Sequence, residues 1–128
     1  MTRSIIRIST TFASLMLVVG LAATPASAGT RWFEPIVRLP LSTVRTFQCV
    51  IHHESTSTFA HPNLGDNNRY GSSGIFQIEQ GTWAAHQAAA HVPYSIHVWQ
   101  ASPYQQSLVA VAIWRADGFW PWHYDGCF

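Results

Sequence analysis

The chain has 128 residues, of which 48% are hydrophobic and only 10% are charged, and it contains no lysine. A chain of this length forms one compact domain but is too short for two. The formal net charge of +1 comes without any basic run, so we expect no nucleic-acid partner. Six tryptophans and four tyrosines are typical of core packing, although carbohydrate sites also use such side chains.

The N-terminal segment has the pattern of a cleavable export signal. Arg3 and Arg7 precede an apolar stretch, residues 12–23, that is too short to span a bilayer. An A-S-A motif ending at Ala28 predicts that residues 1–28 are a signal peptide. The remaining chain of about 100 residues is then expected to be secreted or held at the cell wall, without a membrane anchor. The alternative is an anchor that is not cleaved.

The two cysteines are expected to form a disulfide. In an exported chain Cys49 and Cys127 should be oxidised and paired with each other. Closing a loop of this length stabilises a fold by about 4 to 5 kcal/mol on the chain-entropy model. The alternative, a free catalytic thiol, is disfavoured because Cys49 lies inside a helical pattern and not at an exposed turn.

The domain is predicted to begin with a helix that ends at an acidic residue. Residues 29–41 contain two prolines and no sustained period, which indicates a leader or an irregular strap of unknown order. Residues 42–128 form the domain. Its first helix begins at Ser42 or Thr43, which are plausible N-caps, and ends at Glu54, because apolar residues recur at helical spacing at Val44, Phe47, Val50 and Ile51. The helix dipole at this C-terminal end disfavours a negative charge on Glu54.

The segment after this helix reads as a long polar loop or a small hairpin. Residues 55–81 are rich in Ser, Asn and Gly, and an ordered loop of this length is usually functional. The apolar stretch at residues 75–78 is expected to be buried. Glu79, which follows it, is expected to face solvent.

Two further helices are predicted. One begins at Thr82 and runs over residues 83–90. The other has a capping box, with Ser102 as N-cap, Pro103 as first helical residue and Gln105 as third, and ends at Gly118. The aromatic tail that follows must fold back for Cys127 to reach Cys49.

Three motifs occur in order: Cys49-Val-Ile-His-His-Glu54-Ser55, Tyr70-Gly-Ser-Ser-Gly74-Ile-Phe-Gln77-Ile and Gly81-Thr-Trp83. In this order and spacing they resemble the lysozyme-like superfamily and, within it, the small actinobacterial transglycosylase-like domains related to resuscitation-promoting factors. The resemblance covers roughly residues 44–127. It implies a mainly helical, small α+β lysozyme-like fold with about three helices around a cleft. It also implies that the protein acts on peptidoglycan, and that it does so as a monomer.

The resemblance also implies roles for individual residues. Glu54 would be the catalytic acid, and its alternative is a solvated carboxylate at a helix end. The sugar cleft would be lined by Gln77, Ser73, Gly74 and Tyr70. Gln77 could instead satisfy buried backbone groups, and Trp83 is expected to be a core anchor and not a sugar platform.

Cleavage of a glycosidic bond needs a proton on the leaving oxygen, so burial should keep Glu54 protonated near neutral pH. If the muramyl sugar's own hydroxyl then attacks, this one carboxyl group suffices, as in a lytic transglycosylase. A lysozyme-type hydrolase would need a second carboxylate, for which Asp66 is the candidate in the loop. Asp66 lies in a Gly-Asp-Asn-Asn sequence that favours a turn residue, so the one-glutamate scheme is preferred.

Neither a cofactor nor a metal is expected, because the seven histidines show no ligand spacing. Where relatives tend to carry arginine or glycine around the glutamate, this chain has His52-His53 before it and Thr56-Ser57-Thr58 after it, so the preferred glycan stays open. Two alternatives to an enzyme remain. One is a module that binds peptidoglycan without cutting it, and the other is a disulfide-bonded interaction protein that partners another cell-wall enzyme.

Overall fold

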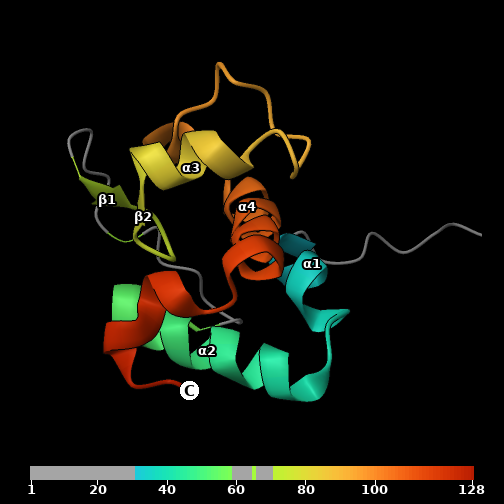
Figure 1. The fold of residues 1–128 in the computed structure, drawn as a ribbon, viewed down its shortest axis with the longest axis vertical. Coiled ribbons are helices and arrows are strands. Elements are labelled where there is room, and N and C mark those ends of the chain that lie inside the picture. The colour runs from blue at the N-terminus through green and yellow to red at the C-terminus, as the bar shows by residue number, and fades with distance from the viewer. Residues whose placement is uncertain (1–30, 59–64, 66–70) are drawn as a thin grey trace, which may run out of the picture.

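The computed structural model describes residues 31–58, 65 and 71–128, and it is mainly helical (Figure 1). The elements in chain order are η1 (Arg31–Phe33), α1 (Glu34–Val37), α2 (Leu41–Ser55), β1 (Ser72–Ser73), β2 (Ile78–Glu79), α3 (Gln80–His86), η2 (Val98–Gln100), α4 (Pro103–Asp117) and η3 (Trp120–Asp125), where η denotes a 3-10 helix. The predicted class, a mainly helical domain with a small hairpin and one disulfide, is confirmed. Across the described ranges, no helix is both long and apolar enough for a membrane span.

α4 is the central element of the domain. It contacts η1, α1 and α3, while α2 packs against η3 (Figure 1). The capping box predicted for α4 is present, since the Ser102 hydroxyl accepts from the Gln105 amide at 3.3 Å and the Gln105 side chain accepts from the Ser102 amide at 2.9 Å. Gly118 ends the helix with φ +65°, as predicted. Local signals therefore define both ends of the helix on which the other elements are packed.

The segment before α2 is helical, which corrects the prediction of an irregular leader for the part from Arg31 onward. η1 and α1 place three apolar side chains in the core: Trp32, Phe33 and Ile36. Pro35 stands in the first turn of α1, where a helix accepts proline because the missing N–H has no partner there anyway. α2 begins at Leu41 with Pro40 before it, so neither Ser42 nor Thr43 is its cap.

The core is built around Phe47 on α2. Its ring makes edge contacts with four aromatic rings at centroid distances of 4.9 to 6.4 Å: Phe76, Trp114, Phe119 and Trp122. The expected burial of the apolar stretch before Glu79 is confirmed for Ile75, Phe76 and Ile78. Trp83 is fully buried and donates from Nε1 to the carbonyl oxygen of Ile96 at 2.8 Å, which agrees with its expected place as a core anchor.

The turn between β1 and β2 requires a glycine at position 74. The two strands pair antiparallel, Ser72 with Glu79 and Ser73 with Ile78, so of the apolar stretch at residues 75–78 only Ile78 lies in a strand. Gly74 has φ +80°, and a Cβ atom there would lie 2.2 Å from Oε1 of Gln106. That buried side chain accepts from the Ile75 amide at 2.7 Å and donates to the Ala101 carbonyl at 3.0 Å. Gln106 of α4 thus holds the hairpin in place.

The predicted disulfide is present and joins α2 to the C-terminal segment. Cys49 and Cys127 have their Cα atoms 5.7 Å apart. Trp122 attaches the same segment to the hairpin, because its Nε1 donates to the carbonyl oxygen of Phe76 at 2.9 Å. η3 is therefore fixed both to α2 and to the β1–β2 turn.

Candidate active site

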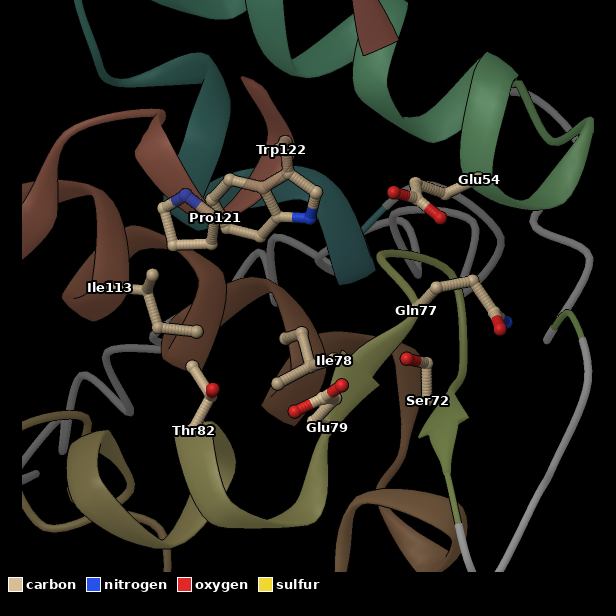
Figure 2. Close-up of a pocket in the computed structure, with 9 residues that line it drawn as sticks. All are labelled: Glu54, Ser72, Gln77, Ile78, Glu79, Thr82, Ile113, Pro121 and Trp122. Atoms are coloured by element: carbon tan, nitrogen blue, oxygen red, sulfur yellow. The ribbon is translucent and has the colours of Figure 1, made fainter. Parts of the chain in front are cut away.

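A cleft of about 410 Å³ lies between the end of α2 with η3 and the hairpin with the start of α3 (Figure 2). Figure 2 shows Glu54 beside Trp122 on one wall, and the side chains of the hairpin on the other wall. The residues that line the cleft are Glu54, Ser72, Gln77, Ile78, Glu79, Thr82, Ile113, Pro121 and Trp122. The cleft is thus formed by four separate parts of the chain, two of which are bridged by the disulfide.

Glu54 is a carboxyl group of this cleft whose pKa lies well above its ordinary value. It is the penultimate residue of α2, whose C-cap Thr56 adopts the left-handed conformation, and its side chain is half-buried. Burial and, to a smaller extent, the carboxyl group of Asp125 raise the pKa of Glu54 from 4.5 to about 7. Near neutral pH the group can therefore both donate and accept a proton.

Asp125, the neighbour of Glu54, had no role in the sequence analysis. It is the last residue of η3 and does not line the cleft. Its Oδ2 atom is buried and finds no hydrogen-bond partner within the described part of the chain. The predicted disulfide indicates that the segments of Asp125 and Glu54 lie close together. Asp125 precedes Cys127 by two residues, and Cys49 precedes Glu54 by little more than one helical turn. Pairing the cysteines brings the two carboxyl groups together.

Gln77 lines the cleft from the turn of the hairpin. Its φ of +46° is unusual for a residue with a side chain, and such strained conformations cluster at functional sites. Its Nε2 donates to the carbonyl oxygen of Gly74 at 2.8 Å. Its position is therefore compatible with both alternatives, a role in lining the sugar cleft and a role in satisfying the backbone. Gln77 hydrogen-bonds a backbone carbonyl and also faces the cleft (Figure 2).

The other residues predicted to line the cleft are placed differently. Ser73 and Gly74 are buried and are not part of the cleft wall, whereas Ser72 is. Glu79 is exposed, as expected, and lines the wall opposite Glu54. Tyr70 and Asp66 lie outside the described residues. The cleft wall of the hairpin is therefore made by Ser72, Gln77 and Glu79.

One group of possible metal ligands occurs among the residues that the structure describes. It consists of Cys49, His53 and Cys127, whose ligand atoms lie within 4.8 Å of one another. The two cysteines are joined in the disulfide, so neither offers a thiolate to a metal ion.

Comparisons with known proteins found no match to a protein-family model, to a curated protein or to a solved structure.

Proposed function

We propose that the chain is an exported enzyme that cleaves peptidoglycan glycan strands at the bond between N-acetylmuramic acid and N-acetylglucosamine, and that it belongs to the lysozyme-like superfamily it resembles. The observation that carries this proposal is Glu54, a half-buried carboxyl group with a pKa near 7 in an open cleft. Carboxyl groups perturbed in this way concentrate at sites that transfer protons. The polar side chains of Ser72, Gln77 and Thr82 on the facing wall are suited to hydrogen-bond sugar hydroxyls.

The reaction that best fits this cleft is that of a lytic transglycosylase with one glutamate. Protonated Glu54 donates its proton to the glycosidic oxygen, and the bond between this oxygen and C1 of the muramyl sugar breaks. The C6 hydroxyl of the same sugar then attacks C1 and gives its proton to the Glu54 carboxylate. The products are an N-acetylglucosamine end and a 1,6-anhydromuramyl end, and Glu54 returns to its protonated form.

A second candidate is a lysozyme-type hydrolase, and the position of Glu79 favours it. Glu79 supplies another carboxyl group on the wall opposite Glu54, which is the arrangement that an enzyme needs to activate a water molecule. Asp66, the candidate from the sequence, keeps this role as a prediction. Export by residues 1–28, the cell wall as the site of action and a monomeric state remain parts of the proposal.

The test uses residues 29–128 and three variants. Purified peptidoglycan is incubated with the wild type, Glu54→Gln, Glu79→Gln and Glu34→Gln, and the released fragments are identified by mass spectrometry. Glu34 is the matched control, because it is a glutamate on α1 that does not line the cleft and is paired with Arg38. Anhydromuramyl fragments from all proteins except Glu54→Gln would support the transglycosylase.

Other products would lead to other conclusions. Hydrated reducing ends, lost in both Glu54→Gln and Glu79→Gln, would replace the transglycosylase by a hydrolase. Binding of the wall by all four proteins without any released fragment would refute the enzyme and leave a peptidoglycan-binding module.

A further inference from the structure

We propose that a second groove, on the side of α4 away from the cleft, binds the acidic peptides that peptidoglycan carries on its muramyl sugars. The groove has a volume of about 390 Å³, close to the 410 Å³ of the cleft, and it is open to solvent. Its walls come from α1, from α4 and from the segment that follows α3. We call it the arginine groove, because Arg38 and Arg115 line it. The origin of the peptide rests on the proposed function.

The arginine groove and the cleft lie on different sides of α4. The residues by which α4 lines the groove recur every three or four positions and so form one face of the helix: Tyr104, Leu108, Val111, Ala112 and Arg115. Ile113, by which α4 lines the cleft, is rotated by roughly 150° about the helix axis from the middle of this face. A ligand in the groove is therefore separated from a ligand in the cleft by the helix itself.

The two walls beside α4 are held in place by contacts of their own. α1 packs against α4 and places Ile36 in the core (Figure 1). In the wall after α3, His91 has φ +55°, and its backbone N–H donates to the carbonyl oxygen of Ala88 at 3.0 Å. The buried side chain of Gln87 donates to the carbonyl oxygen of Pro93 at 2.8 Å. The groove is thus formed before a ligand binds, as sites for small ligands usually are.

The charge of the arginine groove is opposite to that of the cleft. The carboxyl group among its described lining residues belongs to Glu34, which already pairs with Arg38. Arg115 is exposed and has neither an ion-pair nor a hydrogen-bond partner in the part of the chain that the structure describes. The cleft, by contrast, carries the carboxyl groups of Glu54 and Glu79. A carboxylate ligand is therefore attracted to the groove, where a guanidinium group can bind it through two parallel hydrogen bonds.

The remaining surface of the arginine groove suits small apolar side chains. It is formed largely by aliphatic residues: Leu39, Ala89, Leu108, Val111 and Ala112. The ligand that matches both features is a peptide with free carboxylates beside small apolar side chains. The peptides of peptidoglycan, which contain alanine and free carboxyl groups, have this chemistry. Since α4 separates the two sites, we expect the groove to hold a peptide of a neighbouring strand while a glycan strand occupies the cleft.

The test follows peptide binding by NMR on the isotope-labelled protein with its disulfide intact. The probe is the mixture of peptides that an amidase releases from purified peptidoglycan. These peptides should shift the backbone amide signals of Ala89, Leu108 and Ala112 in the groove, and should leave those of Ser72 and Glu79 in the cleft unchanged. The same peptides with their carboxyl groups converted to amides, at equal ionic strength, should not shift the groove signals.

Arg115→Gln and Arg45→Gln form a matched pair of variants. Both remove one exposed arginine that lacks an ion-pair partner within the described residues, but Arg45 lies on α2 and does not line the groove. Arg115→Gln should raise the Kd of the peptides about five-fold, because one exposed charge pair is lost. Arg45→Gln should leave this Kd unchanged. An equal rise in both variants would assign the effect to net charge and overturn the proposal.

Results on the wild type alone can also overturn the proposal, so it does not depend on how well a variant folds. The groove is refuted as a peptide site by groove signals that do not move up to about 10 mM peptide, or by equal shifts with the amidated peptides. Groove signals that move with protein concentration alone would assign the groove to a second copy of the chain instead. If the peptides bind in the groove but no glycan fragments are released in the cleavage assay, the proposed enzyme fails and the groove stands. If fragments are released but the groove signals stay in place, the enzyme stands and the groove is rejected.

Discussion

Replacing Glu54 by glutamine should stabilise the protein at alkaline pH although it removes the proposed acid. The pKa of Glu54 is 4.5 in its ordinary state and about 7 in the folded protein, where burial and then Asp125 raise it. Between these two values the native state binds more protons than the unfolded state, so the stability of the wild type falls as pH rises through this window. The contribution is fully present below pH 4.5 and is lost above about pH 7, and it amounts to at most about 3 kcal/mol because Glu54 is only half-buried.

Glutamine does not titrate, so Glu54→Gln lacks this loss. The difference in the free energy of unfolding between variant and wild type should therefore shift in favour of the variant by up to about 3 kcal/mol from pH 4 to pH 8. Urea unfolding of both proteins at pH 4, 6 and 8, with the disulfide intact, measures this difference. Glu34→Gln serves as the control, because its exposed pair with Arg38 should give little change between these pH values. An equal difference at pH 4 and pH 8 for Glu54→Gln would refute the reasoning.

Three further predictions concern the support of the cleft. Gly74→Ala should destabilise the fold by about 2 kcal/mol or more, because a Cβ atom would clash with Gln106 at a left-handed position, whereas Gly81→Ala, in open space on α3, should stabilise it by about 0.5 to 1 kcal/mol. Gln106→Leu should cost about 2 to 5 kcal/mol, because it leaves a buried amide and a buried carbonyl without partners. Urea unfolding measures each of these changes. Replacing Cys49 and Cys127 by serine should cost about 4 to 5 kcal/mol, given the 78-residue separation. An unfolding free energy of the double variant equal to that of the wild type would contradict this prediction.

The elements that could be predicted from the sequence are those with local signals. The ends of α4 follow from Ser102, Gln105 and Gly118, whose side chains or backbone angles act within one helical turn. The disulfide follows from a count of two cysteines in a chain that is predicted to be exported. α1 was missed because residues 29–41 contain Pro35 and Pro40 and show no sustained period, although proline is accepted in the first turn of a helix.

The details of the site depend on contacts between distant parts of the chain. Side chains on β1 point alternately to opposite faces, so Ser72 reaches the cleft and Ser73 is buried, and the sequence alone does not show which of the two faces outward. Asp125 is separated from Glu54 by most of the domain, and the packing of η3 against α2 together with the Cys49–Cys127 bridge brings the two segments together. The pairing of the cysteines therefore predicts which segments meet, but it does not predict that Asp125 acts on the pKa of Glu54.

The covalent bridge between α2 and the C-terminal segment has a consequence for when activity arises. Cys49 is synthesised early and Cys127 late, so an unfinished or reduced chain carries Glu54 without the covalent link between α2 and the segment that contributes Pro121 and Trp122 to the cleft. Oxidation of thiols takes place mainly after export, in the compartment where peptidoglycan lies. On the proposed function, the bridge would then delay activity, since the cleft around Glu54 would be fixed covalently only in the compartment where cleavage is of use to the cell.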